Sequence, residues 1–160
     1  MEKTDFDAAA RRNGQRLFLL ALSFTKNRAD AEDVIQNVFL KLWRRKEPFG
    51  DGEHTDKWLT AVCVNECRNL LRTPWRRRVT TLTEAEALPV FDDPRDGTLY
   101  RAVAALPTNE RIVIHLFYYE DLSVAEIAKT LRISESAVKT RLCRARKKLK
   151  EILGDDDIDE

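Results

Sequence analysis

The sequence predicts an all-α protein made of two small helical domains, a helical bundle and a helix-turn-helix, joined by a flexible linker. Three observations carry this prediction. Apolar residues recur at helical spacing on both sides of residues 79–97, those residues themselves show no periodicity, and residues 122–149 have a helix-turn-helix pattern. With 160 residues and 43% hydrophobic content, the chain has enough apolar material for two small cores.

The helix-turn-helix pattern begins at a capping box, in which Ser123 is the N-cap and Glu126 stands three residues later. Arg132 and Ile133 form the expected turn, with Ile133 as its buried residue, and Ser134 caps the second helix. The first helix has one apolar face, made of Val124, Ile127, Ala128 and Leu131.

The second helix of this motif combines a narrow apolar seam with a basic outer surface. Its seam residues are Val138, Leu142, Ala145 and Leu149. At about 100° per residue, Arg141 lies nearer the seam and the opposite face holds Ser136, Thr140, Cys143 and Lys147, flanked by Lys139, Arg144, Arg146, Lys148 and Lys150. Such a helix suits the DNA major groove. A solvated basic helix or a coiled-coil strand is the alternative, but neither explains the capped partner helix.

Three helices are expected in the N-terminal half. The first runs from Asp5 to a break at residues 26–28, and the second starts at Ala29 or Asp30. The third runs from about Asp56 to Leu71, after a break rich in Gly at residues 47–52. The residues expected to face inward on the last two are Val34, Ile35, Val38, Phe39, Leu42, Trp43, Trp58, Leu59, Val62, Cys63 and Leu70.

After the linker, a helix is expected from Leu99 to Leu106. Pro107 begins the next helix, with Thr108 as its cap. The core residues expected from that helix are Ile112, Val113, Leu116, Phe117 and Tyr119.

Charge is unevenly distributed along the chain although the net charge is only +1. Cations gather at residues 68–78 and 132–150, and acids gather at residues 84–96 and in the tail 155–160. Because nucleic-acid binding is a property of basic patches rather than of net charge, the two basic stretches are candidate contacts.

The sequence gives little support to other classes of function. The three cysteines do not make a disulfide framework, and Cys63 and Cys67 lack partners for a metal site. No phosphate loop or pairing of nucleophile and base is present, so we expect neither an enzyme nor a cofactor. Without a signal peptide or a long apolar run, we expect a soluble, cytoplasmic protein.

The residues quoted above carry a resemblance to a known family. The stretch from Asn27 to Trp43, followed by Trp58, Asn65 and Arg72, resembles region 2 of the extracytoplasmic-function (ECF) sigma factors. The stretch from Leu106 to Lys148 resembles region 4 of the same family. The resemblance divides the chain into region 2 (1–78), a linker (79–97), region 4 (98–153) and an acidic tail (154–160).

The resemblance implies a function for region 2, which in this family docks on RNA polymerase core, through its largest subunits, and opens the promoter −10 element. The polymerase-binding residues implied are Asp30, Asp33, Gln36 and Asn37. Those implied for the −10 element are Phe49, Asn65, Arg68 and Arg72, with Arg76–Arg78 as further phosphate contacts. Val64 and Asn69 depart from the family pattern, which often has Arg and Asp at those positions.

For region 4, the resemblance implies reading of the −35 element as duplex DNA. The −35 candidates are Ser136, Lys139, Thr140, Arg141, Cys143, Arg144 and Lys147. The implied partners are core polymerase, promoter DNA and an anti-sigma factor, which in this family is often membrane-bound; no small-molecule substrate is implied. The linker in this family threads into the polymerase near its active site.

Two other functions remain open at this point. One is a free-standing helix-turn-helix regulator that does not bind core polymerase, although the Asn27–Trp43 pattern argues against it. The other is a decoy sigma factor that only titrates an anti-sigma factor, which the departures at Val64 and Asn69 leave open.

Overall fold

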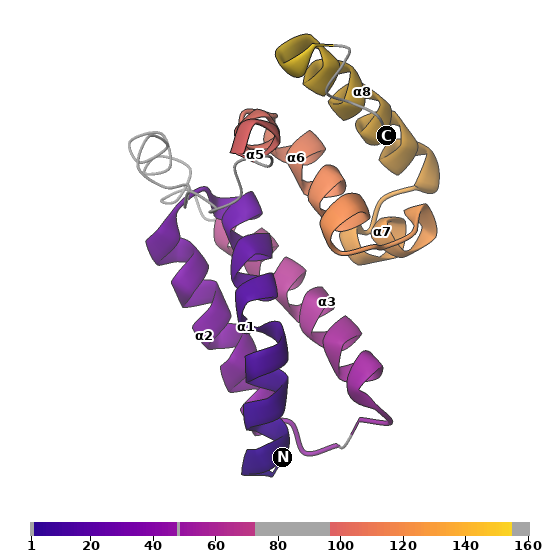
Figure 1. Ribbon diagram of the computed structural model, residues 1–160. Helices are drawn as coiled ribbons and strands as arrows, with labels where there is room; N and C mark the ends of the chain where they lie inside the picture. Colours follow the sequence, from indigo (N-terminus) through magenta and orange to yellow (C-terminus); the bar gives the residue numbers. More distant parts are fainter. Residues whose placement is uncertain (1, 48, 73–96, 155–160) are drawn as a thin grey trace. The chain divides into compact units, whose positions relative to one another are not determined.

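The computed structural model describes residues 2–47, 49–72 and 97–154, and every regular element within these ranges is a helix (Figure 1). The chain divides into two compact units, Met1–Leu88 and Pro89–Glu160. Arg76–Arg78, nearly all of the expected linker and the tail 155–160 lie outside the described residues. Within the described ranges, no helix combines the length and the apolar character needed to cross a membrane.

The N-terminal unit is a bundle of three helices that pack against one another: α1 (Lys3–Thr25), α2 (Arg28–Arg44) and α3 (Gly52–Leu71) (Figure 1). Five of the residues predicted to face inward on α2 and α3 are buried: Val34, Val38, Leu42, Leu59 and Cys63. Five more are half-buried: Ile35, Phe39, Trp58, Val62 and Leu70. The core also includes Leu17, Leu20, Ala21 and Leu22 of α1, with Val64 and Cys67 of α3, which the periodicity did not predict. Trp43 was expected to face inward but is 47% exposed. It lies at the edge of the apolar arc of α2 and makes an edge-to-face contact with Phe6, with ring centroids 5.2 Å apart.

The helix boundaries in this unit are set by two side-chain caps. Asn27 accepts a hydrogen bond from the backbone N–H of Asp30 (3.0 Å), so α2 begins at Arg28, slightly earlier than expected. Asp51 accepts one from the N–H of His54 (2.8 Å), so α3 begins at Gly52 rather than near Asp56. In both places the cap stands inside a stretch whose composition indicates a break, and its hydrogen bond decides where the helix begins.

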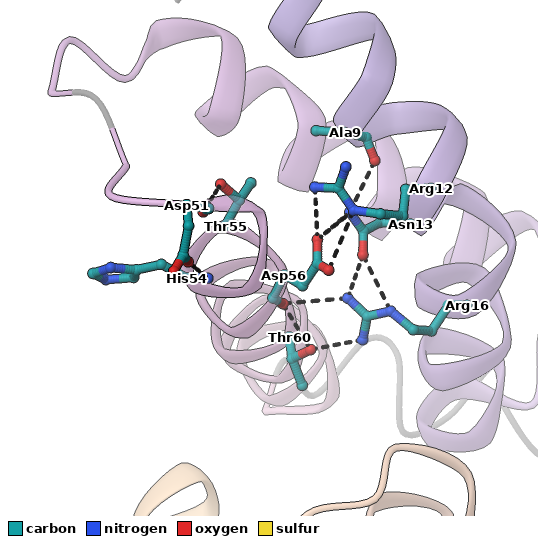
Figure 2. Close-up of polar contacts among 9 residues, drawn as sticks. All are labelled: Ala9, Arg12, Asn13, Arg16, Asp51, His54, Thr55, Asp56 and Thr60. Atoms are coloured by element: carbon teal, nitrogen blue, oxygen red, sulfur yellow. Dashed lines mark hydrogen bonds and ion pairs between the residues drawn. The ribbon is translucent and has the colours of Figure 1, made fainter.

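A polar network joins α1 to α3 around Asp56 (Figure 2). Arg12 donates from Nε to both carboxylate oxygens of Asp56 (3.0 and 3.2 Å), and Asn13 donates to one of them (2.8 Å). Asn13 is 1% exposed and also donates to the carbonyl of Ala9 (2.9 Å). Arg16 completes the network, because it donates to Asn13 Oδ1 (2.7 Å) and to the hydroxyl of Thr60 (2.7 Å). Every polar atom of the Asn13 side chain is thus paired despite its burial.

The environment of Asp56 shifts its acidity. Burial raises the pKa of this carboxyl, but hydrogen bonds from Arg12 and Asn13, with the charges of Arg12 and Arg16, outweigh burial. The pKa therefore lies below its ordinary value of 3.8, and Asp56 is ionised at neutral pH.

The C-terminal unit contains α5 (Gly97–Ala104), α6 (Thr108–Ile114), a π-helical turn η1 (His115–Tyr119), α7 (Val124–Leu131) and α8 (Glu135–Leu153). Helix α8 packs against α5, α6 and α7. Thr108 was expected to cap α6, but Pro107 holds that position and Thr108 is the first helical residue. Tyr119, expected in the core, is 48% exposed. The π-helical turn adds a residue to the helical repeat, which rotates Tyr119 away from the face that Ile112 and Leu116 share.

The charge of Asp56 makes the stability of the N-terminal unit depend on pH. Because its folded pKa is lowered, this contribution is present above the unfolded pKa and is lost as the pH falls through the folded pKa. We expect Asp56→Asn to lower the free energy of unfolding by about 1–3 kcal/mol at pH 7, and the difference from wild type to shrink below pH 4. Urea unfolding followed by tryptophan fluorescence reports on this unit, because Trp43 and Trp58 lie in it and the sequence has no tryptophan within residues 89–160.

Glu53→Gln is the matched control, because the Glu53 side chain is 78% exposed and forms an ion pair with Lys57 of the same helix. It should change stability by less than about 0.5 kcal/mol. A constant difference between Asp56→Asn and wild type from pH 7 to pH 3 would contradict the assigned role of the carboxylate.

Candidate nucleic-acid interface

The turn between α7 and α8 is built by local hydrogen bonds that the sequence predicted in part. Ser123 and Glu126 form the expected capping box, with both reciprocal hydrogen bonds at 3.1 Å. Helix α7 ends where Arg132 takes a left-handed conformation (φ 59°), and the N–H of Ile133 then donates to the carbonyl of Ala128 (3.0 Å). This is the hydrogen bond of a Schellman motif, which reverses the chain immediately after the helix.

Helix α8 is fixed by its cap and its seam. Ser134 Oγ accepts a hydrogen bond from the N–H of Ala137 (3.0 Å), which confirms the predicted cap. The four predicted seam residues are all buried, with exposed fractions of 6% or less: Val138, Leu142, Ala145 and Leu149. Ile133 is only half-buried, since it stands at the rim of the turn rather than under it. Burial of one narrow stripe directs the rest of α8 outward.

The outward face of α8 carries the residues that the sequence proposed for DNA. Arg141 is half-buried beside the seam, as its helical position implied. Thr140 donates its hydroxyl hydrogen to the carbonyl of Ser136 (3.0 Å), so the hydroxyl oxygen is left as an acceptor toward solvent. The exposed candidates are Ser136, Lys139, Thr140, Cys143, Arg144 and Lys147.

Two cations of α8 have structural partners that the sequence did not reveal. Lys148 Nζ lies 3.0 and 2.9 Å from the two carboxylate oxygens of Glu110 on α6. Arg146 Nε donates to the hydroxyl of Tyr118 (2.8 Å), and its guanidinium lies 5.5 Å from the ring centroid of Phe117. These partners stand 38 and 28 residues away in the sequence, so no local pattern indicates them.

The remaining cations of α8 form the accessible basic surface of this unit. Within residues 97–154, these cations have no side-chain hydrogen bond or ion pair: Lys139, Arg141, Arg144, Lys147 and Lys150. Their charges are therefore available to an external anion such as a phosphate of the DNA backbone.

The outer face of α2 is the second exposed surface of interest. Asp33, Gln36 and Asn37 are exposed there, and Leu40, one turn farther along, is 44% exposed. Asp30 differs from the other three candidates, because it is only 6% exposed in the first turn of α2. A carboxylate at this position also stabilises the start of the helix through the helix dipole.

The candidates for the −10 element lie along α3 and the connection that precedes it. Asn65 and Arg72 are exposed, and Arg68 is half-buried. Phe49 stands before α3 and contacts Trp58, with ring centroids 5.5 Å apart, while Asn65 lies about 10 Å farther along the helix axis. The departure at Val64 is a core position, 1% exposed, and so removes no surface contact.

A hollow of about 770 Å³ opens beside Phe49 and was not foreseen from the sequence. It lies between the start of α1 and the connection from α2 to α3, two segments that are far apart in the sequence. Its lining residues are Glu2, Asp5, Ala8, Ala9, Arg12, Arg45, Lys46, Glu47, Phe49, Asp51, Gly52 and Thr55.

The cysteines of α3 are packing residues. Cys63 and Cys67 are fully buried, and Cys63 donates a weak hydrogen bond to the carbonyl of Leu17 (3.7 Å between Sγ and O). A hydrogen bond with Cys63, together with burial, raises the pKa of the Cys67 thiol well above its usual range. Both effects favour the protonated form, which is a poor nucleophile and a poor metal ligand. Cys143 is exposed on α8.

A capped helix-turn-helix with a basic outer face, together with a separate three-helix bundle, defines a helical DNA-binding protein with a second binding module. Comparison with known families specifies the class. Residues 9–77 match the model of Sigma-70 region 2, and residues 96–149 match that of Sigma-70, region 4.

Individual relatives agree with these matches. The chain is 34% identical over 134 residues to the ECF RNA polymerase sigma factor SigL of Mycobacterium tuberculosis, covering 79% of this chain and 76% of SigL. It is 31% identical over 146 residues to the RNA polymerase sigma factor SigV of Bacillus subtilis, covering 90% of this chain and 88% of SigV. The chain belongs to the ECF family of RNA polymerase sigma factors.

Solved structures show the same fold. The sigma factor RpoE in complex with the anti-sigma factor NepR, from Bartonella quintana, superposes with a TM-score of 0.71 at 23% identity, covering 98% of this chain and 99% of that one. CnrH in complex with the cytosolic domain of CnrY superposes with a TM-score of 0.62 at 27% identity, covering 95% of this chain and 89% of that one.

Neighbouring lysines on α8 should have opposite roles. We expect Lys148→Met to destabilise the C-terminal unit by about 1–2 kcal/mol, because it leaves the buried carboxylate of Glu110 without its partner. Lys147→Met should change stability by less than about 0.5 kcal/mol, because Lys147 is exposed. Hydrogen exchange followed by mass spectrometry on peptides from α6 and α8 measures the difference. Equal exchange in the two variants would refute the structural role of Lys148.

Proposed function

We propose that this sigma factor directs promoter-specific initiation by using α8 to read the −35 element and the N-terminal bundle to dock on core polymerase and trap −10 bases. One observation carries the proposal: α8 buries its seam and has, around an exposed polar face, five cations that pair with nothing in the described part of the chain, which also carries a region 2 module. The core polymerase performs the chemistry, and we assign no catalytic step to this chain.

On the −35 element, the exposed residues of α8 divide into two kinds of contact. Arg144 has a free planar guanidinium, which is suited to paired hydrogen bonds with guanine in the major groove. Thr140 and Cys143 are short and lie centrally, so they contact thymine methyl groups or sugars at close approach. Arg141, Lys139 and Lys147 neutralise phosphates on either side of the groove.

Polymerase docking is assigned to the outer face of α2. Gln36 and Asn37 present amide groups that donate and accept hydrogen bonds, and the exposed Leu40 adds an apolar contact on the same face. Asp33 supplies negative charge at the start of this surface. The buried Asp30 supports the helix from which these residues project.

On the −10 element, Asn65 is the residue assigned to an unpaired base. Its exposed amide can pair with the hydrogen-bonding edge of a base that has left the stack. Arg72 follows at the end of α3 and neutralises the adjoining backbone, with Arg68 closer to the helix surface. Phe49 offers a ring at the edge of the hollow.

Regulation by an anti-sigma factor is part of the proposal. Both solved structures named above are complexes, one with an anti-sigma factor and one with the cytosolic domain of CnrY. We assign this chain a partner of the same kind, and we place the chain in the cytoplasm, where core polymerase works.

Run-off transcription tests the whole proposal. Core polymerase is supplied with a pool of promoters of random sequence, with and without this protein and with Asn65→Ala. Transcripts that start only with the wild-type protein would give the −35 and −10 sequences directly. Failure to bind core would refute the assignment of α2, and binding without initiation would favour a decoy.

The guanidinium of Arg144 should contribute sequence discrimination. We expect Arg144→Ala to raise the Kd of the holoenzyme for its promoter by about 5- to 150-fold, and to relax selection at one base pair of the −35 element. Fluorescence anisotropy with labelled promoter measures Kd. The control is Arg101→Ala, which removes an exposed cation from α5 and should have little effect. Equal losses in the two variants would mean that Arg144 acts as general positive charge only.

The amide of Gln36 should contribute to polymerase binding. We expect Gln36→Arg to weaken core binding by about 5- to 30-fold, because a longer, charged side chain replaces an amide at the centre of the α2 face. Surface plasmon resonance on immobilised core measures the affinity. Arg11→Ala, an exposed change on α1, is the control. Unchanged affinity of Gln36→Arg would exclude this face of α2 from the interface.

A further inference from the structure

Arg45 holds together the connection between α2 and α3. It is the C-cap residue of α2, where the backbone leaves the helix (φ −68°, ψ 128°). Its Nε donates to the carbonyl of Glu47 (3.1 Å), and its guanidinium carbon lies 4.2 Å from the ring centroid of Phe49 and 5.0 Å from that of Trp58. One half-buried side chain from the end of α2 therefore contacts the connection at two points and α3 at a third.

The aromatic rings around Arg45 form a cluster of their own. Phe49 lies 5.5 Å from Trp58 and 5.8 Å from His54, both at about 60° between ring planes. Each of these contacts has an edge-on geometry, so the rings do not stack flat on one another. Because the guanidinium contacts Phe49 and Trp58 together, it sets the orientation of Phe49 relative to α3.

The hollow beside Phe49 suits an uncharged ligand group. Its rim contains three cations, Arg12, Arg45 and Lys46, and a larger number of acids: Glu2, Asp5, Glu47 and Asp51. Acids in excess repel a phosphate, whereas an uncharged, planar group with hydrogen-bond donors meets acceptors on several sides. An unstacked nucleobase has this character and can use the exposed part of the Phe49 ring.

We propose that Arg45 is a positioning residue for capture of a −10 base: its contacts with Phe49, Trp58 and Glu47 hold the Phe49 ring at the mouth of the hollow before DNA arrives. The proposal rests on the assignment of the −10 element to the N-terminal bundle. It adds a residue whose role is to place Phe49, through its contacts with the connection and with α3. Pre-organisation of this kind removes the cost of ordering the connection during promoter melting.

The test measures base capture separately from promoter affinity. Holoenzyme is bound to fork-junction DNA in which the non-template −10 strand is unpaired, and an abasic site is placed at each unpaired position in turn. In the wild type, the abasic site at the captured position should weaken binding by about 5- to 150-fold, the range expected for one stacked base. In Arg45→Ala this penalty should fall to less than about threefold, while core binding stays as in wild type.

Two further variants make the result decisive. Arg44→Ala removes the neighbouring exposed cation and should keep the full abasic penalty. Arg45→Met keeps an unbranched apolar stem beside the rings, so it should fold even where Arg45→Ala does not. It lacks the guanidinium, and with it the hydrogen bond to Glu47 and the cation contacts with Phe49 and Trp58, so it should also lose the penalty.

The outcomes separate this inference from the proposed function. A full abasic penalty in folded Arg45→Ala or Arg45→Met refutes the role of Arg45 and leaves the −10 assignment intact. Absence of any penalty in the wild type refutes base capture by this bundle, and the role of Arg45 with it. Loss of the penalty in the two Arg45 variants alone establishes the inference.

Discussion

Burial of four side chains along α8 is the constraint on which the DNA-facing surface depends. Val138, Leu142, Ala145 and Leu149 form a stripe one side chain wide, and a stripe that narrow permits only one rotation of the helix about its axis. The pairs Lys148–Glu110 and Arg146–Tyr118 join the same helix to α6 and η1. This rotation determines which cations of α8 reach a partner within residues 97–154. Lys148 and Arg146 do so, and the other cations remain accessible to an external anion.

Polar contacts fix how the helices of the N-terminal bundle join, whereas an apolar seam does so in the C-terminal unit. The Asp56 network joins α1 to the first half of α3, and Arg45 joins the end of α2 to the same half. Both contacts border the connection that carries Phe49. Charged hydrogen bonds are directional and fail when geometry shifts, whereas apolar contacts tolerate sliding. If the bundle must hold the Phe49 ring at a fixed place, charged hydrogen bonds suit that task better than apolar contacts.

Periodicity predicted the long helices and their seams well, because a 3.6-residue repeat over many residues is a strong local signal. All four seam residues of α8 and both caps of the helix-turn-helix were predicted correctly. The predicted burial was wrong where the helical repeat changes or where the apolar face of a helix ends. The π-helical turn shifted Tyr119 outward, and the edge of the α2 arc left Trp43 half exposed.

The parts of the candidate sites that the sequence missed are tertiary. No local pattern distinguishes Lys148 from Lys147, because the difference is a carboxylate 38 residues earlier in the chain. The same holds for the hollow, whose two walls come from the start of α1 and from the connection before α3. The burial of Asp30 is also tertiary information: its residue type suits an exposed binding face, but it is only 6% exposed in the first turn of α2.

The division of the chain into two units has a consequence for promoter choice. A single small helical domain buries limited DNA surface and binds weakly at physiological salt. Two such modules on one chain multiply their effects once a common partner holds both, because the second contact then occurs at a high effective concentration. In the proposed function, the α2 face provides the attachment to that partner, and α8 and α3 provide the two DNA contacts. Under this proposal selectivity belongs to the assembled holoenzyme, and a change in the α2 face would alter promoter use without touching a base.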